Sequence, residues 1–232
     1  LRIVTLLENK YYNFTGLNLT IETLDGLIKH NGPVNDLNPY SKNINKLIFK
    51  RRIIFSNFPS LEAQIATISD DIAYNNHDLE DGLRADLFNI NKLNSIPIIS
   101  RIVEKHLKNA RTFRREIIVN QIVRELINLM VIDVINTTNK KLKKVKPKSI
   151  EDIYKQDQLI VDFSIPMKKQ VAEIKEFLRI NMYNHKNVII NTNKGKKIIK
   201  DLFRHLVKNH KNYINKSLFE KEQKERVIAD FI

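Results

Sequence analysis

Residues 60–86 combine a helical apolar stripe with the densest group of carboxylates in an otherwise basic chain. The stripe advances in steps of four, three and four residues, which is the period of one face of an α-helix. Its members are Leu61, Ile65, Ile68 and Ile72. Ser60 is a favoured N-cap residue, so we expect a helix to begin there. Gly82 is expected to end or bend this helix.

The opposite side of the same helix is predicted to be polar. At 100° per residue, five side chains fall within an arc of about 100°: Asp70, Tyr74, His77, Asp78 and Asp81. Asn75 and Asn76 add further polar groups, and small alanines border this face. Between residues 57 and 100 there are seven carboxylates and two basic side chains. Such carboxylates repel one another unless a metal ion or basic neighbours offset them.

Asp70 is therefore a candidate ligand for a hard divalent ion, which prefers oxygen donors. Tyr74 lies one helical turn further on, where its hydroxyl could bind a phosphate or its ring could pack on a sugar. The simpler interpretation is that this face is a solvated surface, and composition alone favours it. The His77-Asp78 dipeptide is weak evidence for a metal site, because adjacent helical residues point about 100° apart.

The chain as a whole is predicted to be all-α. Five glycines and six prolines in 232 residues leave most of it free to be helical. Thr20 precedes an apolar-periodic run that Asn31-Gly32-Pro33 would end. Residues 1–11 also have a helical period. The pattern of residues 34–59 does not distinguish a short helix from a short strand. Only short pieces such as 158–163 resemble a strand. Further helices are expected over residues 98–107, 114–138, 166–183, 194–209 and 219–232.

Residues 139–148 hold six lysines and are predicted to be a solvated connector or a helix end. They would separate a helical region over residues 1–138 from a second over residues 149–232. Ser149 and Asp152 have the spacing of a capping box at the start of the second region. The absence of cysteine excludes disulfides and thiolate metal sites, which fits a cytoplasmic protein. No apolar run approaches the roughly 18–20 residues of a membrane span.

The net charge of +14 favours anionic partners such as nucleotides or nucleic acid. A genome rich in AT would produce the same excess of Lys, Asn and Ile, so both explanations stay open. Phosphate-binding glycine loops and zinc-hydrolase motifs are absent from the sequence. The remaining histidines are expected to lie on the surface or to be satisfied by neighbours. They are His30, His106, His185, His205 and His210.

Several longer segments resemble one known family. They are LRIVTLLE, GLNLTIETLDGLIKHNGP, SLEAQIATISDDIAYNNHDLEDGLRA, NMYNH and RVIADFI. Together they make the chain similar, over its whole length, to the deoxyguanosinetriphosphate triphosphohydrolase-like proteins, which are bacterial dNTP triphosphohydrolases of the HD superfamily. The resemblance implies part of a helical HD-domain-like core, followed by an additional helical C-terminal region. It also implies hydrolysis of a dNTP, with dGTP as the expected substrate, to a deoxynucleoside and triphosphate.

By this resemblance Asp70 matches the last metal-binding aspartate, Tyr74 a substrate-contacting tyrosine, and Asp78 an acidic position at the substrate pocket. The metal would be Mg or Mn. The family's other three ligands, a histidine and a His-Asp pair, lie upstream of LRIVTLLE, and His77-Asp78 cannot replace them. We therefore expect a C-terminal portion that is inactive alone. The resemblance also implies a homo-oligomer and makes nucleic acid a candidate partner. The alternative is a non-catalytic basic helical module that binds nucleic acid or partner subunits.

Overall fold

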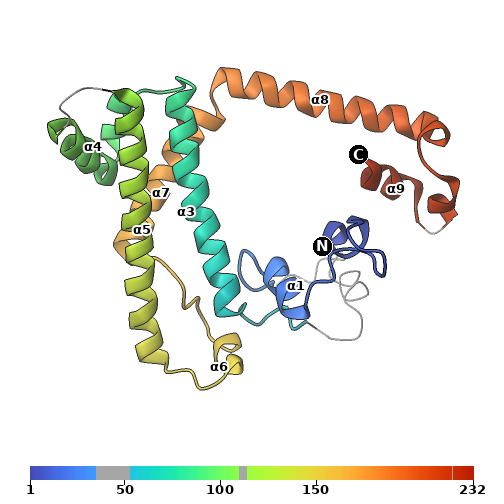
Figure 1. The fold of residues 1–232 in the computed structure, drawn as a ribbon, viewed down its shortest axis with the longest axis horizontal. Helices are drawn as coiled ribbons and strands as arrows, with labels where there is room; N and C mark the ends of the chain where they lie inside the picture. The colour runs from blue at the N-terminus through green and yellow to red at the C-terminus, as the bar shows by residue number, and fades with distance from the viewer. Residues whose placement is uncertain (35–52, 110–113, 221) are drawn as a thin grey trace. The chain divides into compact units, whose positions relative to one another are not determined.

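The computed structural model describes residues 1–34, 53–109, 114–220 and 222–232. Every regular element in these residues is a helix, which confirms the all-α prediction (Figure 1). Most of the untyped segment 34–59 lies outside the described residues. The chain forms two compact units, Leu1–Arg179 and Ile180–Ile232. The boundary between these units falls later in the chain than the predicted connector 139–148. The division into residues 1–138, a connector and residues 149–232 stays a prediction.

The first unit is built around two long helices, α3 (Leu61–Arg84) and α5 (Arg115–Val145), which pack along each other (Figure 1). α4 packs on α5, whereas α7 and α1 pack on α3. The shorter elements are η1 (Ile3–Leu7), α1 (Ile21–Ile28), η2 (Ile90–Ser95), α4 (Pro97–Asn109), α6 (Ile150–Tyr154) and α7 (Ile165–Leu178). The helical period predicted for residues 1–11 thus yields only the single π-turn η1.

Three predicted helix starts are confirmed by their caps. The Thr20 hydroxyl accepts the Thr23 N–H at 3.3 Å, and the Ser60 hydroxyl accepts the Ala63 N–H at 3.3 Å. Ser149 forms the predicted capping box, in which its hydroxyl accepts the Asp152 N–H while the Asp152 carboxylate accepts the Ser149 N–H. These side chains satisfy N–H groups that have no partner within the helix.

Gly82 does not end α3, contrary to the sequence prediction, because the helix continues through it to Arg84. A Cβ atom at position 82 would lie 2.3 Å from Cε1 of Phe88. The buried Phe88 ring in turn packs edge-on against Phe177, with ring centroids 4.9 Å apart. Glycine is therefore needed here because the aromatic ring approaches the backbone closely, not because the helix stops.

The buried face of α3 also differs from the predicted stripe. Ile65 is 52% exposed, whereas Gln64, Asn75 and Asn76 are buried. The two asparagines, which add further polar groups to this helix, therefore lie on its inner side. Asn76 is fully buried, and its Nδ2 donates to the Ile72 carbonyl oxygen at 2.8 Å and lies 3.3 Å from the sulfur of Met130 on α5. The hydrogen bond of Nδ2 offsets part of the cost of burying the amide, whereas Oδ1 has no hydrogen-bond partner among the described residues.

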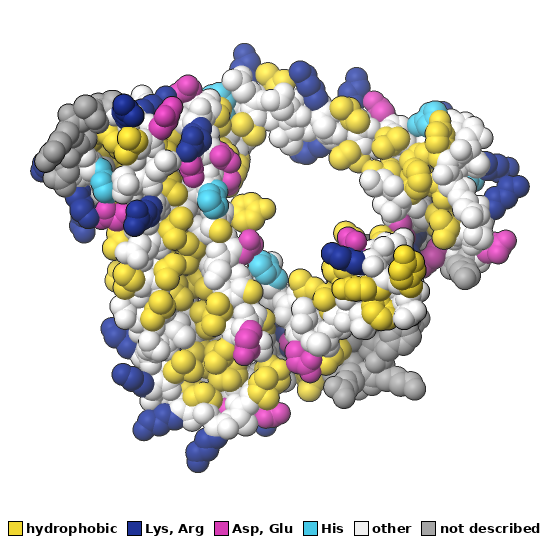
Figure 2. Space-filling model, viewed as in Figure 1, with side chains coloured by type: hydrophobic (Ala, Val, Ile, Leu, Met, Phe, Trp, Pro, Cys, Tyr) yellow, Lys and Arg dark blue, Asp and Glu magenta, His cyan; other side chains and the backbone are white. Residues whose placement is uncertain are grey.

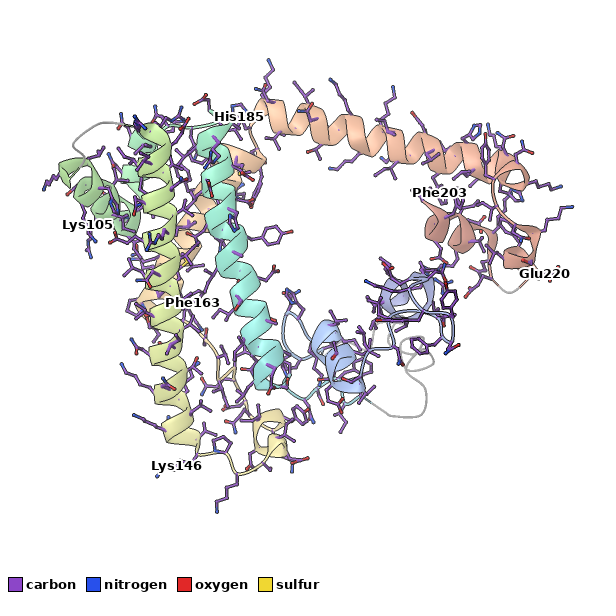
Figure 3. All side chains as sticks on the ribbon, in the orientation of Figure 1. Lys105, Lys146, Phe163, His185, Phe203 and Glu220 are labelled. Atoms are coloured by element: carbon purple, nitrogen blue, oxygen red, sulfur yellow. The ribbon has the colours of Figure 1, made fainter. Side chains whose placement is uncertain are left out.

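The lysine-rich segment is the last two turns of α5 rather than a free connector. α5 runs to Val145, and Lys146 (labelled in Figure 3) ends it in a left-handed conformation with φ of 48°. The strand-like residues 158–163 form no strand, although Ile160, Val161 and Phe163 are buried. Their backbone is instead bonded to side chains of α3 and α5, as described below.

The second unit contains α8 (Lys186–Asn209), η4 (His210–Asn212), η5 (Lys216–Glu220) and α9 (Lys224–Phe231). Between the units, η3 (Arg179–Tyr183) continues α7 as a π-turn. α8 begins at Lys186, earlier than the predicted residue 194, and His185 caps it through Nδ1. A small core of buried residues ties α8 to α9: Leu206, Ile214, Val227 and Ile228, with Phe203 packed beside them.

Two glycine substitutions test this packing. Gly82→Ala should destabilise the protein by about 1–3 kcal/mol, because the added methyl group overpacks the Phe88 contact. Gly195→Ala is the matched control, since position 195 lies within α8 and an added methyl group there would meet no other atom within 4 Å. It should stabilise its helix by about 0.5–1 kcal/mol. Denaturant unfolding followed by circular dichroism measures both. A neutral or stabilising Gly82→Ala contradicts the packing described.

A pH-dependent contact joins α4 to α5. The Glu125 carboxylate accepts a hydrogen bond from Lys105 Nζ at 2.7 Å and lies 2.8 Å from His106 Nε2. The hydrogen bond from Lys105, followed by that from His106, holds the pKa of Glu125 below its ordinary value of 4.5. A depressed carboxyl pKa stabilises the fold above the unfolded value, and this contribution is lost as pH falls through the folded pKa.

Glu125→Gln should therefore destabilise the protein at neutral pH by up to about 1 kcal/mol, the range of exposed ion pairs. The difference from the parent chain should shrink as the pH falls below 4.5 and vanish below the depressed pKa of Glu125, where the carboxyl of the folded parent also becomes neutral. Thermal melts across this range measure it. Glu104→Gln, on the exposed side of α4, should show little effect, and a constant Glu125→Gln penalty at all pH values would refute the linkage.

Candidate functional site

Asp70, Tyr74 and Asp78 lie at successive turns of α3, so they share one stripe of the helix. The side chain of Asp70 is 52% exposed and Tyr74 is 65% exposed, while Asp78 is partly buried. The stripe faces away from the buried contacts that α3 makes with α5. In Figure 2, carboxylates and imidazoles lie along this exposed edge of α3. The structure thus brings the three predicted site residues together on one accessible surface.

His30 is the neighbour of Asp70 that sequence reasoning missed. Its Nε2 lies 3.7 Å from Oδ2 of Asp70, although the two residues are forty positions apart in the chain. The Thr67 hydroxyl lies 3.0 Å from the His30 carbonyl oxygen and so tethers the end of α1 to α3. His30 was predicted to lie on the surface or to be satisfied by neighbours, and its side chain is indeed 47% exposed. The prediction did not identify Asp70 as its partner. No local spacing could have indicated this contact, because it depends on how α1 packs on α3.

Two other carboxylates of α3 have basic neighbours. Asp71 lies 3.0 Å from Lys175 Nζ of α7, and Glu80 pairs with Arg84 at 2.7 Å. His77 Nδ1 lies 3.7 Å from Glu80, which agrees with the argument that His77 does not face Asp78. Basic neighbours therefore offset part of the charge of the acidic segment. Asp70 differs, because its nearby group is an imidazole, a common ligand for divalent metals.

The described residues supply an incomplete set of metal ligands. They hold no group of three or more His, Asp or Glu side chains that could bind a metal ion. Asp70 offers a carboxylate, a donor that suits Mg and Mn, and His30 offers an imidazole, a donor that suits transition-metal ions rather than Mg. Such ions take about six ligands, so these two side chains alone would leave most positions to water or to other groups.

Gln64 holds the first half of α3 in place. Its side chain is 3% exposed, Nε2 donates to the Pro59 carbonyl oxygen at 2.9 Å, and Oε1 accepts the N–H groups of Ile160 and Val161 at 2.9 and 3.0 Å. One amide thus satisfies three backbone groups of two separate segments. These buried hydrogen bonds fix the rotation of α3 about its axis. They therefore also fix the direction in which Asp70, Tyr74 and Asp78 face.

Comparisons with known proteins agree with this picture. Residues 161–232 match the family described as the phosphohydrolase-associated domain. Over 232 residues the chain is 48% identical to the deoxyguanosinetriphosphate triphosphohydrolase-like protein of Pelagibacter ubique, covering all of this chain and 62% of that protein. It is 40% identical to the protein of the same name from Bartonella henselae, covering all of this chain and 60% of the relative. The Brucella ovis protein is 41% identical over 214 residues, or 88% of this chain and 52% of the relative.

The match to the phosphohydrolase-associated domain thus covers the all-helical last third of the chain. Over its whole length the chain is similar to proteins named deoxyguanosinetriphosphate triphosphohydrolase-like, in agreement with the resemblance that its sequence motifs indicated. It spans about three fifths of the length of the first two of these relatives. No helix in the described ranges is both long and apolar enough to cross a lipid bilayer.

Replacing the buried amide tests the anchor of the site. Gln64→Leu would leave the Ile160 and Val161 N–H groups without their acceptor. Each unsatisfied buried group costs about 1–3 kcal/mol, so the variant should lose roughly 3 kcal/mol of stability. Gln158→Leu, at an exposed position in the same segment, should change stability by less than about 0.5 kcal/mol. Denaturant unfolding distinguishes them, and equal midpoints would show that Gln64 does not anchor α3.

Proposed function

We propose that these residues form part of a metal-dependent triphosphohydrolase that converts a dNTP and water to a deoxynucleoside and triphosphate. dGTP is the proposed substrate, since the relatives carry that substrate in their names. The observation that carries the proposal is the exposed stripe of Asp70, Tyr74 and Asp78 on α3, with His30 beside Asp70, in a chain that aligns throughout with those relatives.

The proposed roles follow from the chemistry of each side chain. Asp70 would supply a carboxylate ligand to Mg or Mn, and His30 is close enough to add an imidazole. A bound divalent ion would polarise the α-phosphate and lower the pKa of a water molecule. The Tyr74 hydroxyl can donate a hydrogen bond to a phosphate oxygen, or its ring can pack on the sugar. Asp78, one turn further, can accept hydrogen bonds from the nucleoside.

We further propose that the ion needs ligands from polypeptide outside the described residues. A single carboxylate and a single imidazole are too few to hold a catalytic divalent ion in a defined geometry. The 232-residue chain alone is accordingly proposed to be inactive towards dGTP. A second copy of the chain is a proposed partner as well, and a dNTP substrate places the protein in the cytoplasm.

The alternative function is a basic helical module that binds nucleic acid or partner subunits without catalysis. It is favoured by α8, whose side chains include seven basic groups and a single acidic one, Asp201. The basic groups are Lys186, Lys194, Lys196, Lys197, Lys200, Arg204 and Lys208. Binding through such a helix would fall steeply with salt, since phosphate contacts release counterions.

Reconstitution separates the two functions. The chain is assayed for release of deoxyguanosine and triphosphate from dGTP with Mn, first alone and then joined to the remaining part of the Pelagibacter relative. We expect no product from the chain alone and activity after reconstitution. Asp70→Asn should then reduce the rate at least about 100-fold, because a metal ligand is lost.

Asp81→Asn is the control for that assay, since it removes a carboxylate from the same helix outside the proposed ligands. Its rate should stay within about threefold of the parent, and neither variant should weaken binding to a polyanion. Deoxyguanosine formed by the isolated chain would refute the proposed shortage of ligands. Full activity of Asp70→Asn in the reconstituted protein would refute the role of Asp70.

A further inference from the structure

A cavity of about 290 Å³ lies in the first unit, on the side of α3 that carries Asp71 rather than Asp70. It is bounded by α3, α7, residues 159–163 and the end of α1. Asp70, Tyr74 and Asp78 do not line it. We propose that this cavity binds a phosphate monoester with a flat apolar body, with the phosphate held by Lys168 and Lys175. Its lining includes His30, the neighbour of Asp70, so the cavity adjoins the stripe assigned to the proposed function but does not contain the stripe residues themselves.

The inner wall of the cavity is apolar and buried. Val161, Phe163 and Val171 line it and are 3%, 7% and 6% exposed (Phe163 is labelled in Figure 3). An apolar body placed against these side chains would gain about 25 cal/mol for each Å² removed from water. The volume lies near the lower end of the range for small-molecule sites, which suits a compact ligand.

This wall is held at three points, so the cavity exists without a ligand. Gln64 accepts the backbone N–H groups of Ile160 and Val161. Lys141 Nζ donates to the Leu159 carbonyl oxygen at 2.8 Å. Asp133 accepts both the N–H and the hydroxyl of Ser164, at 2.8 and 2.7 Å. A preformed site avoids the cost of ordering its residues when a ligand binds.

Lys168 can turn to a ligand at little cost because Asp162 has two cationic partners. The same carboxylate oxygen of Asp162 lies 2.6 Å from Lys168 Nζ and 3.0 Å from Lys141 Nζ. If Lys168 moved to an incoming phosphate, Lys141 would still compensate the Asp162 charge. Lys141, Lys168 and Lys175 thus outnumber the two lining carboxylates that they pair with, Asp71 and Asp162, and this excess of positive charge favours an anion.

Lys175 provides the second ammonium group. It pairs with Asp71 at 3.0 Å, and the two side chains are 48% and 50% exposed. An ion pair this exposed contributes at most about 1 kcal/mol, so a dianionic phosphate can compete for the lysine. Lys168 and Lys175 lie two turns apart on α7, about 10 Å along its axis, and both line the cavity. A phosphate placed between their long side chains could therefore contact both ammonium groups.

Phenyl phosphate is the probe, titrated into the 232-residue chain with EDTA present and followed by protein NMR. It should bind, whereas inorganic phosphate and phenol should each bind at least tenfold more weakly. Lys168→Gln and Lys175→Gln should each weaken binding about tenfold, and Lys169→Gln, an exposed neighbour on α7 outside the cavity, should not. Ala172→Leu should also weaken binding, because its larger side chain would fill the cavity while leaving both lysines in place.

Three outcomes would overturn the proposal. They are the absence of phenyl phosphate binding, equal binding of inorganic phosphate, and equal loss of affinity in Lys169→Gln and Lys168→Gln. The last two would indicate general attraction to a basic surface. Asp70→Asn should leave the affinity unchanged, so failure of this site and failure of the proposed hydrolase site are distinguishable. An Asp70→Asn variant that loses phenyl phosphate binding would merge the two sites and refute their separation.

Discussion

Two buried amide side chains lie on the inner side of α3, and one of them, Gln64, fixes how the helix is oriented in the first unit. Gln64 ties the beginning of the helix to Pro59 and to the backbone of Ile160 and Val161. Asn76, three turns later, donates within the helix and contacts Met130 of α5. An amide in an apolar interior is costly unless its hydrogen bonds are made, so the bonds of Gln64 to other segments penalise any other rotation of the helix. Asn76 adds its contact with Met130, while its own Oδ1 has no partner among the described residues. Apolar stripes alone would permit more sliding and rotation.

The candidate site depends on that orientation. With Asn76 turned inward, Asp70, Tyr74 and Asp78 occupy the exposed side, and α1 can deliver His30 to Asp70. The same rotation directs Asp71 towards Lys175 and the cavity beside α7. Neighbouring carboxylates on one helix thereby acquire different surroundings, one beside an imidazole and one beside an ammonium group. Their proposed roles differ for that reason.

The sequence predicted the helices well where local chemistry decides them. The caps at Thr20, Ser60 and Ser149 were predicted correctly, because each depends on a side chain three residues or fewer from the group it bonds. Gly82 was misread because its reason is the Phe88 ring, a tertiary contact. The burial of Asn75 and Asn76 was not predicted, because the packing of α3 against its neighbours is a tertiary property.

The site was predicted in part. Periodicity placed Asp70, Tyr74 and Asp78 on one stripe, and the family resemblance gave them roles that stay proposals. His30 and the cavity beside α7 could not be predicted, because they arise where segments far apart in the sequence meet. The chain has no cysteine, so single cysteines introduced on α3 report its orientation directly. We predict that a thiol reagent labels Tyr74→Cys at least about 100-fold faster than Asn76→Cys under native conditions, as expected for exposed and buried positions. Equal labelling rates would contradict the orientation of α3 on which the site depends.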